Sequence, residues 1–158
     1  MNAIQQKNAS SIGERISAYN WSNIVEELYS GGSAILKSLL TQQECEATAK
    51  LYAAENIFRS RVVMERHGFG RGEYQYFSYP LPELVGELRR ELYPLLMPTA
   101  NHWNQVMGID YQYPNTLAEF TKRCHSAGQL RPTPLLLQYR EGDYNCLHQD
   151  LYGEHIFP

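Results

Sequence analysis

The sequence predicts a single domain of the α+β class. Apolar stripes with helical spacing dominate most of the chain, whereas its C-terminal part contains short segments typical of strands. The 158 residues are enough for one domain, and 43% hydrophobic with 20% charged residues are compatible with a packed core. Helices followed by strands, rather than alternating with them, indicate α+β.

The N-terminal part is predicted to be an arm followed by two helices. Residues 1–18 are polar and lack periodicity, so we expect a flexible arm, with the domain itself over residues 19–158. The first helix ends at Gly31-Gly32 and carries an apolar stripe formed by Trp21, Ile24, Val25 and Leu28. Residues 34–40 are expected to form a buried strand. Thr41 and Glu44 form a capping box that opens a helix to about Asn56.

The middle of the chain is predicted to contain a strand pair and three helices. Residues 57–79 should form two extended pieces around a Gly-rich loop at 68–72. Pro82 suits the first position of a helix, and the next two prolines, Pro94 and Pro98, are expected to divide the helical pattern in two. Asn115 is the expected cap of a further helix, on which Phe120 and Cys124 share one face.

The C-terminal part is predicted to be a β-hairpin. Residues 135–139 form one strand, residues 140–143 a turn, and residues 144–151 a returning strand. Side chains two apart on a strand point to the same face, so we expect His148 and Asp150 to point together, with Cys146 on that inward face.

Composition excludes several classes of protein. The formal charge of -3 argues against a globally basic nucleic-acid binder. No apolar run is long enough to span a bilayer, and the first residues lack the apolar region of a secretory signal. Three widely spaced cysteines favour a reducing compartment, so we expect a cytoplasmic protein without a membrane partner.

The strongest chemical signal is His148-Gln149-Asp150. An imidazole and a carboxylate side by side on one strand face can both bind one metal ion. With one more histidine they would form the 2-His-1-carboxylate triad, which leaves three positions on Fe(II) open for other ligands. A bare His-x-Asp tripeptide is also common by chance, as a surface histidine beside a solvated carboxylate.

Two longer segments resemble a known family. YREGDYNCLHQDLYGEHIFP (139–158) and RHGFGRGEYQYFSYPLP (66–82) resemble bacterial Fe(II)/2-oxoglutarate-dependent oxygenases, in particular a group described as oxidative demethylases of alkylated nucleic acid. The resemblance implies a double-stranded β-helix, or jelly-roll barrel, with helices packed outside it. It also implies His148 and Asp150 as metal ligands and catalytic residues, Fe(II) as cofactor, and 2-oxoglutarate and O₂ as co-substrates.

The resemblance also implies parts that this sequence lacks. The family's distal metal histidine and its 2-oxoglutarate arginine lie well beyond the His-x-Asp pair, whereas this chain ends eight residues after Asp150. His155 is a poor substitute, because it lies beyond the expected strand end. We therefore expect a chain truncated within the barrel and inactive alone. A non-catalytic relative, or a hydroxylase of proteins or small molecules, remains an alternative.

Further residues are candidates for binding. Tyr139, on the preceding strand, is either a contact of 2-oxoglutarate or an ordinary core tyrosine. Arg66, Arg71 and Tyr74 belong to a cluster rich in arginine and aromatic residues, which could bind phosphates and stack on bases of a nucleic-acid substrate. A mobile Gly-rich loop over the pocket would suit base flipping. The alternative is a strand pair with an exposed, charged face.

Overall fold

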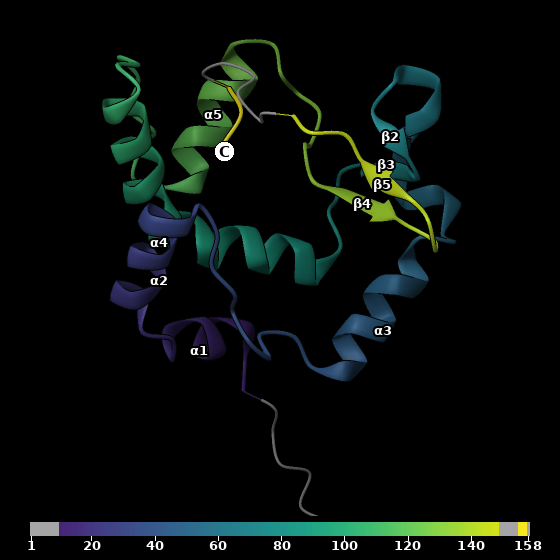
Figure 1. The fold of residues 1–158 in the computed structure, drawn as a ribbon, viewed down its shortest axis with the longest axis horizontal. Coiled ribbons are helices and arrows are strands. Elements are labelled where there is room, and N and C mark those ends of the chain that lie inside the picture. Colours follow the sequence, from purple (N-terminus) through teal and green to yellow (C-terminus); the bar gives the residue numbers. More distant parts are fainter. Residues whose placement is uncertain (1–9, 149–154, 158) are drawn as a thin grey trace, which may run out of the picture.

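The computed structural model describes residues 10–148 and 155–157. In this part of the chain, helices and small antiparallel sheets occupy different regions, which confirms the α+β class (Figure 1). The helices are α1 (Ile12–Ser17), α2 (Trp21–Gly31), α3 (Gln42–Leu51), α4 (Glu83–Val106) and α5 (Leu117–Ser126). The strands are β1 (Phe58–Val63), β2 (Gly70–Arg71), β3 (Glu73–Phe77), β4 (Leu135–Gln138) and β5 (Tyr144–Asn145).

Part of the expected N-terminal arm is a helix. Helix α1 begins with a capping box between Ser11 and Glu14, and it packs against α4. Its two isoleucines, Ile12 and Ile16, are 5% and 1% exposed. This differs from the predicted arm over residues 11–18. Two apolar residues in a six-residue helix are too few for a periodic pattern, so the capping box of Ser11 and Glu14 was the local signal that could have revealed this helix.

The next two helices agree well with the sequence prediction. Helix α2 begins at Trp21 and is capped by Gly32, and α3 opens with the predicted capping box between Thr41 and Glu44. Helix α3 ends at Leu51, earlier than the expected Asn56, because a short 3-10 helix at Glu55–Ile57 leads into β1.

The predicted buried strand at residues 34–40 is wrong. These residues form an irregular segment with a turn, in which Ser38 has a φ of 60° and the Leu39 N–H donates to the Leu36 carbonyl. Ile35 is 75% exposed. The hydroxyl of Tyr19 donates to the Lys37 carbonyl at 2.6 Å. The apolar residues therefore do not enter a sheet.

Helix α4 continues through both internal prolines. The sequence predicted two helices, whereas the structure has one of 24 residues that contains Pro94 and Pro98. Figure 1 shows the two ends of this helix pointing in different directions. Proline removes a backbone donor and bends a helix, and burial of Tyr93 and Ala100 against the core offsets that cost. In the described part of the chain, no helix combines the length and apolarity needed to cross a bilayer.

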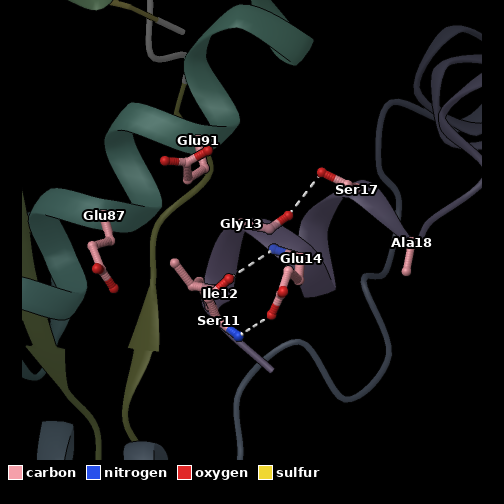
Figure 2. A pocket seen from close by; sticks show the side chains of 8 residues that line it. All are labelled: Ser11, Ile12, Gly13, Glu14, Ser17, Ala18, Glu87 and Glu91. Carbon is pink, nitrogen blue, oxygen red and sulfur yellow. Dashed lines mark hydrogen bonds between the residues drawn. The ribbon is translucent and has the colours of Figure 1, made fainter. Parts of the chain in front are cut away.

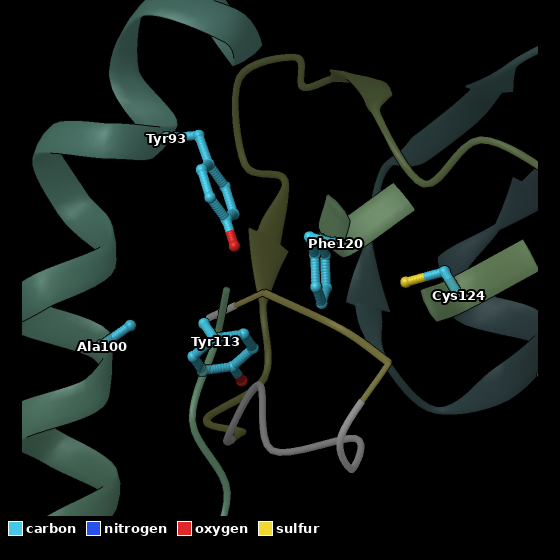
Figure 3. Packing of buried hydrophobic residues seen from close by; sticks show 5 residues of the cluster. All are labelled: Tyr93, Ala100, Tyr113, Phe120 and Cys124. Atoms are coloured by element: carbon cyan, nitrogen blue, oxygen red, sulfur yellow. The ribbon is translucent and has the colours of Figure 1, made fainter. Parts of the chain in front are cut away.

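The core lies between α4 and α5 and is largely aromatic (Figure 3). Phe120 of α5 stacks with Tyr93 of α4 at 5.8 Å between ring centroids, and Tyr113 meets Phe120 edge-on at 5.6 Å. Phe157 packs against the same cluster. Helix α5 is capped by Thr116 and its partner Glu119, one residue later than the predicted cap Asn115. Burial of Phe120 and Cys124 confirms the predicted inner face.

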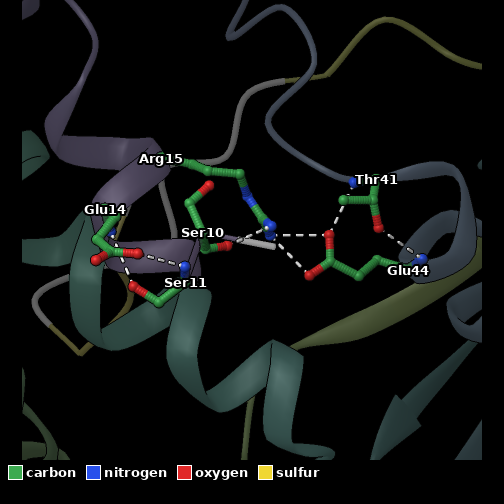
Figure 4. Close-up of polar contacts among 6 residues, drawn as sticks. All are labelled: Ser10, Ser11, Glu14, Arg15, Thr41 and Glu44. Atoms are coloured by element: carbon green, nitrogen blue, oxygen red, sulfur yellow. Dashed lines mark hydrogen bonds and ion pairs between the residues drawn. The ribbon is translucent and has the colours of Figure 1, made fainter. Parts of the chain in front are cut away.

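An ion pair joins α1 to α3 (Figure 4). The Arg15 guanidinium donates to both carboxylate oxygens of Glu44, at 2.7 and 2.8 Å. Glu44 also accepts a hydrogen bond from the backbone N–H of Thr41 at 2.8 Å. One carboxylate thus completes a helix cap and holds a second helix in place.

The strands form two sheets, ordered β1-β3-β4 and β2-β5. Strand β3 lies in the middle of the first sheet, where Glu73 pairs with Val63 on one side and with Gln138 on the other. The expected pair of extended pieces around a Gly-rich loop is confirmed as β1 and β3. The jelly-roll barrel remains an expectation from the resemblance.

Candidate functional site

The predicted turn after β4 is present, but the strand that follows it pairs differently from the prediction. The Asp143 N–H donates to the Arg140 carbonyl at 2.9 Å, and the Arg140 N–H donates to the Asp143 carboxylate at 2.8 Å. A simple hairpin would pair β5 with β4, whereas β5 pairs with β2. Strand β5 contains only Tyr144 and Asn145, so the prediction of a continuous strand at 144–151 is wrong at residues 146–148.

The Gly-rich loop holds the segment that leads to His148. In the β2–β5 ladder Gly70 pairs with Asn145 and Arg71 with Tyr144, and the Cys146 N–H donates to the Phe69 carbonyl at 2.9 Å. The loop is also bonded to its other neighbour, since the Phe69 N–H donates to the Met64 carbonyl at 3.1 Å. The loop is therefore hydrogen-bonded on both sides, and its role as a substrate lid stays a prediction.

His148 is exposed and follows β5. Its Nδ1 lies 2.9 Å from the carbonyl oxygen of Cys146. If Nδ1 carries the proton it donates to this carbonyl, and the lone pair then resides on Nε2. Metal-binding histidines commonly donate their second ring N–H in this way, which fixes both the tautomer and the ring orientation. His148 therefore fits the role of a metal ligand through Nε2.

The remaining candidate ligands are less well placed or lie outside the described residues. Asp150 lies outside them, so its shared direction with His148 stays a prediction. Within residues 10–148 and 155–157, no three His, Cys, Asp or Glu side chains are grouped closely enough to hold a metal ion. Cys146 is exposed, which corrects its expected inward direction. His155 is half-buried beside α5, where its backbone carbonyl lies 3.4 Å from the Cys124 sulfur.

Tyr139 directly follows β4 and lies against the Gly-rich loop. Its side chain is 45% exposed, and its ring approaches Gly72 so closely that a β-carbon there would lie 2.8 Å from Cδ1. This exposure argues against an ordinary core tyrosine. Its role as a contact of 2-oxoglutarate stays a prediction.

The predicted substrate residues lie on different parts of the sheet region. Arg66 is exposed in a 3-10 helix at Met64–His67, and Arg71 is exposed on β2 opposite Tyr144. Tyr74 on β3 is half-buried and meets Tyr76 edge-on at 5.5 Å. The structure therefore groups Arg71 with an exposed tyrosine, and Tyr74 with a second tyrosine of the same strand.

Two other arginines of this cluster already have structural partners. Arg59 lies over the Tyr76 ring, 4.4 Å from its centroid, and Arg61 forms an ion pair with Glu73. In the described part of the chain, neither Arg66 nor Arg71 belongs to an ion pair. These two therefore remain the better candidates for an anionic substrate.

Glu73 of β3, Arg61 of β1 and Tyr52 at the end of α3 form a hydrogen-bonded network. The Tyr52 hydroxyl donates to Glu73 at 3.0 Å. The hydrogen bond from Arg61 lowers the pKa of Glu73, and burial together with the bond to Glu73 raises the pKa of Tyr52 to about 12. At neutral pH the carboxylate is therefore ionised and the phenol is neutral, which suits a structural role.

A hollow between α1 and α4 is lined by acidic side chains but contains none of the candidate site residues (Figure 2). The hollow is largely open to solvent and has a volume of about 690 Å³. Glu14 is used in the capping box of α1, while Glu87 and Glu91 lie within 4.0 Å of Arg90. These carboxylates thus have local partners.

Sequence reasoning missed the contact made by Gly70. This glycine lies under the backbone of β5, where a side chain would collide with Tyr144. A glycine within a strand often marks the close approach of another backbone, and the alternating glycines at 68, 70 and 72 were the signal that could have revealed it.

The chain matches a known family. A family model described as an oxygenase catalysing oxidative methylation of damaged DNA matches residues 72–158, more than half of the chain. The chain belongs to this oxygenase family. The matched residues include Tyr74, Tyr139 and the His148-Gln149-Asp150 motif, and they begin directly after Arg71.

The chain also resembles two curated proteins, each named as uncharacterized, from two strains of Mycobacterium tuberculosis. Each is 39% identical over 111 residues, which cover 67% of this chain and 48% of the relative. The chain thus spans about half the length of the curated relatives it matches. No solved structure matches it.

Proposed function

We propose that the protein is an Fe(II)- and 2-oxoglutarate-dependent dioxygenase that hydroxylates alkylated nucleic acid and so removes N-methyl groups by oxidation. The observation that carries this proposal is the position of His148. This residue lies in the family-matched region, and its Nδ1 lies 2.9 Å from a backbone carbonyl oxygen. In the neutral tautomer with its proton on Nδ1, Nε2 would carry the lone pair that a metal ligand needs. The family description supports an oxygenase that acts on damaged DNA.

The proposed donor set is His148, Asp150 and a further histidine. Nitrogen and carboxylate donors in this ratio suit non-haem Fe(II), since three protein ligands leave sites for a co-substrate and O₂. Bound Fe(II), with 2-oxoglutarate and O₂, supplies oxidation of a C–H bond, which yields succinate and CO₂ and lets a hydroxylated N-methyl group leave as formaldehyde.

Other residues of the chain would bind and orient the reactants. Tyr139, exposed beside the Gly-rich loop, would donate its hydroxyl to 2-oxoglutarate. The exposed guanidinium groups of Arg66 and Arg71 would bind phosphates of the substrate, and Tyr74 would contact the substrate from β3.

Anaerobic titration with Fe(II) and 2-oxoglutarate tests the metal chemistry. We expect the visible charge-transfer absorption of the chelate to appear, and to disappear in His148→Ala. His125→Ala is the matched control, because His125 is an exposed histidine on α5. Absence of the band from both this chain and a version as long as the curated relatives would overturn the proposal. A band in the longer version alone would assign the activity to that version and a non-catalytic state to this chain.

Formaldehyde release tests the substrate. The chelate-forming protein, given O₂ and a single-stranded oligonucleotide with N-methylated bases, should release formaldehyde together with succinate. Succinate formation with other substrates, but no formaldehyde from the oligonucleotide, would reassign the chemistry to a hydroxylase of proteins or small molecules.

A further inference from the structure

We propose that Gly70 is a positioning residue for His148. Because Gly70 has no side chain, β5 lies directly on the Gly-rich loop, and this contact fixes the backbone that carries His148. The inference rests on the proposed function only for the role of His148 as a metal ligand. Gly70 precedes the family-matched residues 72–158, so the family match does not include this contact.

The backbone of β5 occupies the space that a side chain at residue 70 would need. A β-carbon on Gly70 would overlap the carbonyl oxygen of Tyr144 and would lie 3.0 Å from both Asn145 Cα and the Cys146 nitrogen. All three are backbone atoms, so no change of rotamer could make room. Gly70 is buried and has a φ of 118°, a conformation that residues with side chains rarely adopt.

The contact reaches His148 through Cys146. The N–H of Cys146 donates to the Phe69 carbonyl at 2.9 Å. Its own carbonyl oxygen lies 2.9 Å from Nδ1 of His148. The backbone of Cys146 is thus held by the loop at its nitrogen and contacts the imidazole at its oxygen. A displacement of β5 away from residue 70 would move the hydrogen-bond acceptor of His148.

The loop itself is firmly anchored, which lets it act as a template. The Met64 N–H donates to the Gly72 carbonyl at 3.0 Å, and the Met64 carbonyl accepts from the Phe69 N–H at 3.1 Å. The Met64 side chain is 1% exposed. A collision at residue 70 should therefore displace the short strand β5 more readily than the loop.

Substitution of two neighbouring glycines separates this contact from backbone strain. Gly70→Ala adds a methyl group against β5, whereas Gly68→Ala adds one at a φ of 71° with nothing within 4 Å. We expect Gly70→Ala to weaken Fe(II) binding by about tenfold or more, as loss of a histidine's supporting contacts does elsewhere. Gly68→Ala should retain the wild-type affinity.

A second readout does not depend on metal. Nitrogen-15 NMR of the His148 imidazole in the metal-free chain should report Nδ1 protonation and its hydrogen bond. We expect these resonances to change in Gly70→Ala and to stay unchanged in Gly68→Ala. If neither the wild-type chain nor a version as long as the curated relatives binds metal, the proposed function fails, whereas this NMR comparison still decides the positioning role. Unchanged His148 resonances in a folded Gly70→Ala protein would overturn the inference.

A pair of substitutions at Cys146 approaches the contact from its other side. Cys146→Pro removes the N–H that donates to Phe69, whereas Cys146→Ala keeps it, and the residue is exposed. We expect the proline variant alone to shift the His148 resonances. This pair decides the question if Gly70→Ala fails to fold, and identical spectra for the two variants would overturn the proposal.

Discussion

The hydroxyl of Tyr113 donates to the backbone carbonyl of Ile156 at 2.9 Å. This bond joins the aromatic core between α4 and α5 to residues 155–157 near the C-terminus. The neighbouring Phe157 strengthens the contact, since its ring lies 5.1 Å from that of Tyr113. The segment that carries His148 is thus held by the Gly-rich loop at Cys146, and the chain is held again at Ile156.

Tyr113→Phe should lower the free energy of unfolding. The substitution removes one hydrogen bond at a side chain that is 7% exposed, which costs about 1 kcal/mol. Urea unfolding followed by circular dichroism measures the change. Tyr144→Phe is the matched control, because Tyr144 is 58% exposed and should tolerate loss of its hydroxyl. Equal stability of the two variants would show that the bond to Ile156 contributes nothing.

Glu44 should make folding stability depend on acid pH. Hydrogen bonding to the Thr41 backbone N–H, together with Arg15, lowers the pKa of Glu44 below its ordinary value of 4.5. A carboxyl with a lowered pKa contributes stability that is fully present above the pKa of the unfolded chain and is lost as pH falls through the folded-state pKa. The stability difference between wild type and Glu44→Gln should therefore be largest near neutral pH and shrink below about pH 4.5.

Urea midpoints measured across this pH range test the expectation. Glu26→Gln provides the control, because Glu26 is an exposed residue of α2 and should leave the pH dependence unchanged. A wild-type advantage over Glu44→Gln that stays constant from neutral pH to pH 3 would contradict the assignment.

Local signals made the helices predictable, whereas pairing between distant segments was not. The capping box of Thr41 and Glu44 was predicted from the sequence because its atoms lie within four consecutive residues. The apolar residues 34–40 have the composition of a buried strand. A strand also needs a partner strand, however, and a local sequence pattern does not show whether one exists. The prediction of two helices in place of α4 was wrong for a related reason. Packing of α4 against the core outweighs the local tendency of Pro94 and Pro98 to end a helix.

The candidate site shows the same limit. His148 and Asp150 could be named as candidate ligands from the sequence, and the predicted turn at 140–143 is present. The pairing of β5 with β2 could not, because a turn between two apolar segments favours a hairpin in which those segments pair with each other. The contact of Gly70 with Tyr144 joins residues more than seventy positions apart, so it becomes visible only in the structure.

Gly72→Ala should destabilise the sheet and displace Tyr139. Gly72 has a φ of 129°, and a β-carbon there would lie 2.8 Å from Tyr139 Cδ1 and 3.2 Å from the Gln138 carbonyl oxygen. Gly108→Ala is the matched control, since Gly108 also has a positive φ, of 70°, but has open space around it. The Gly72 variant should lose more stability than the control by about 1 kcal/mol or more.

Urea unfolding of the two variants measures the difference, and the NMR signals of the Tyr139 ring report its displacement. Equal losses of stability with unchanged Tyr139 signals would contradict the predicted collision and would leave backbone strain as the whole effect.

Arg66 and Arg71 should contribute to nucleic-acid binding in a salt-dependent manner, if the proposed substrate is correct. Both guanidinium groups are exposed, and neither belongs to an ion pair within the described residues. Each phosphate contact with a single strand contributes about -0.7 to the slope of log affinity against log salt concentration. The double variant Arg66→Ala/Arg71→Ala should therefore bind a methylated single-stranded oligonucleotide more weakly, with a slope less steep by roughly 1.4.

Fluorescence anisotropy at several salt concentrations measures both quantities. Arg131→Ala is a suitable control, because Arg131 is exposed between α5 and β4 and carries the same charge. An equal decrease of the salt slope in the control would indicate a diffuse effect of net charge rather than contacts at these positions.

Tyr74→Phe separates stacking from hydrogen bonding, since it keeps the ring that meets Tyr76 edge-on and removes only the hydroxyl. If Tyr74 contacts a base through its ring, this variant should keep the wild-type affinity and salt slope, whereas a lower affinity at an unchanged slope would assign the contact to the hydroxyl.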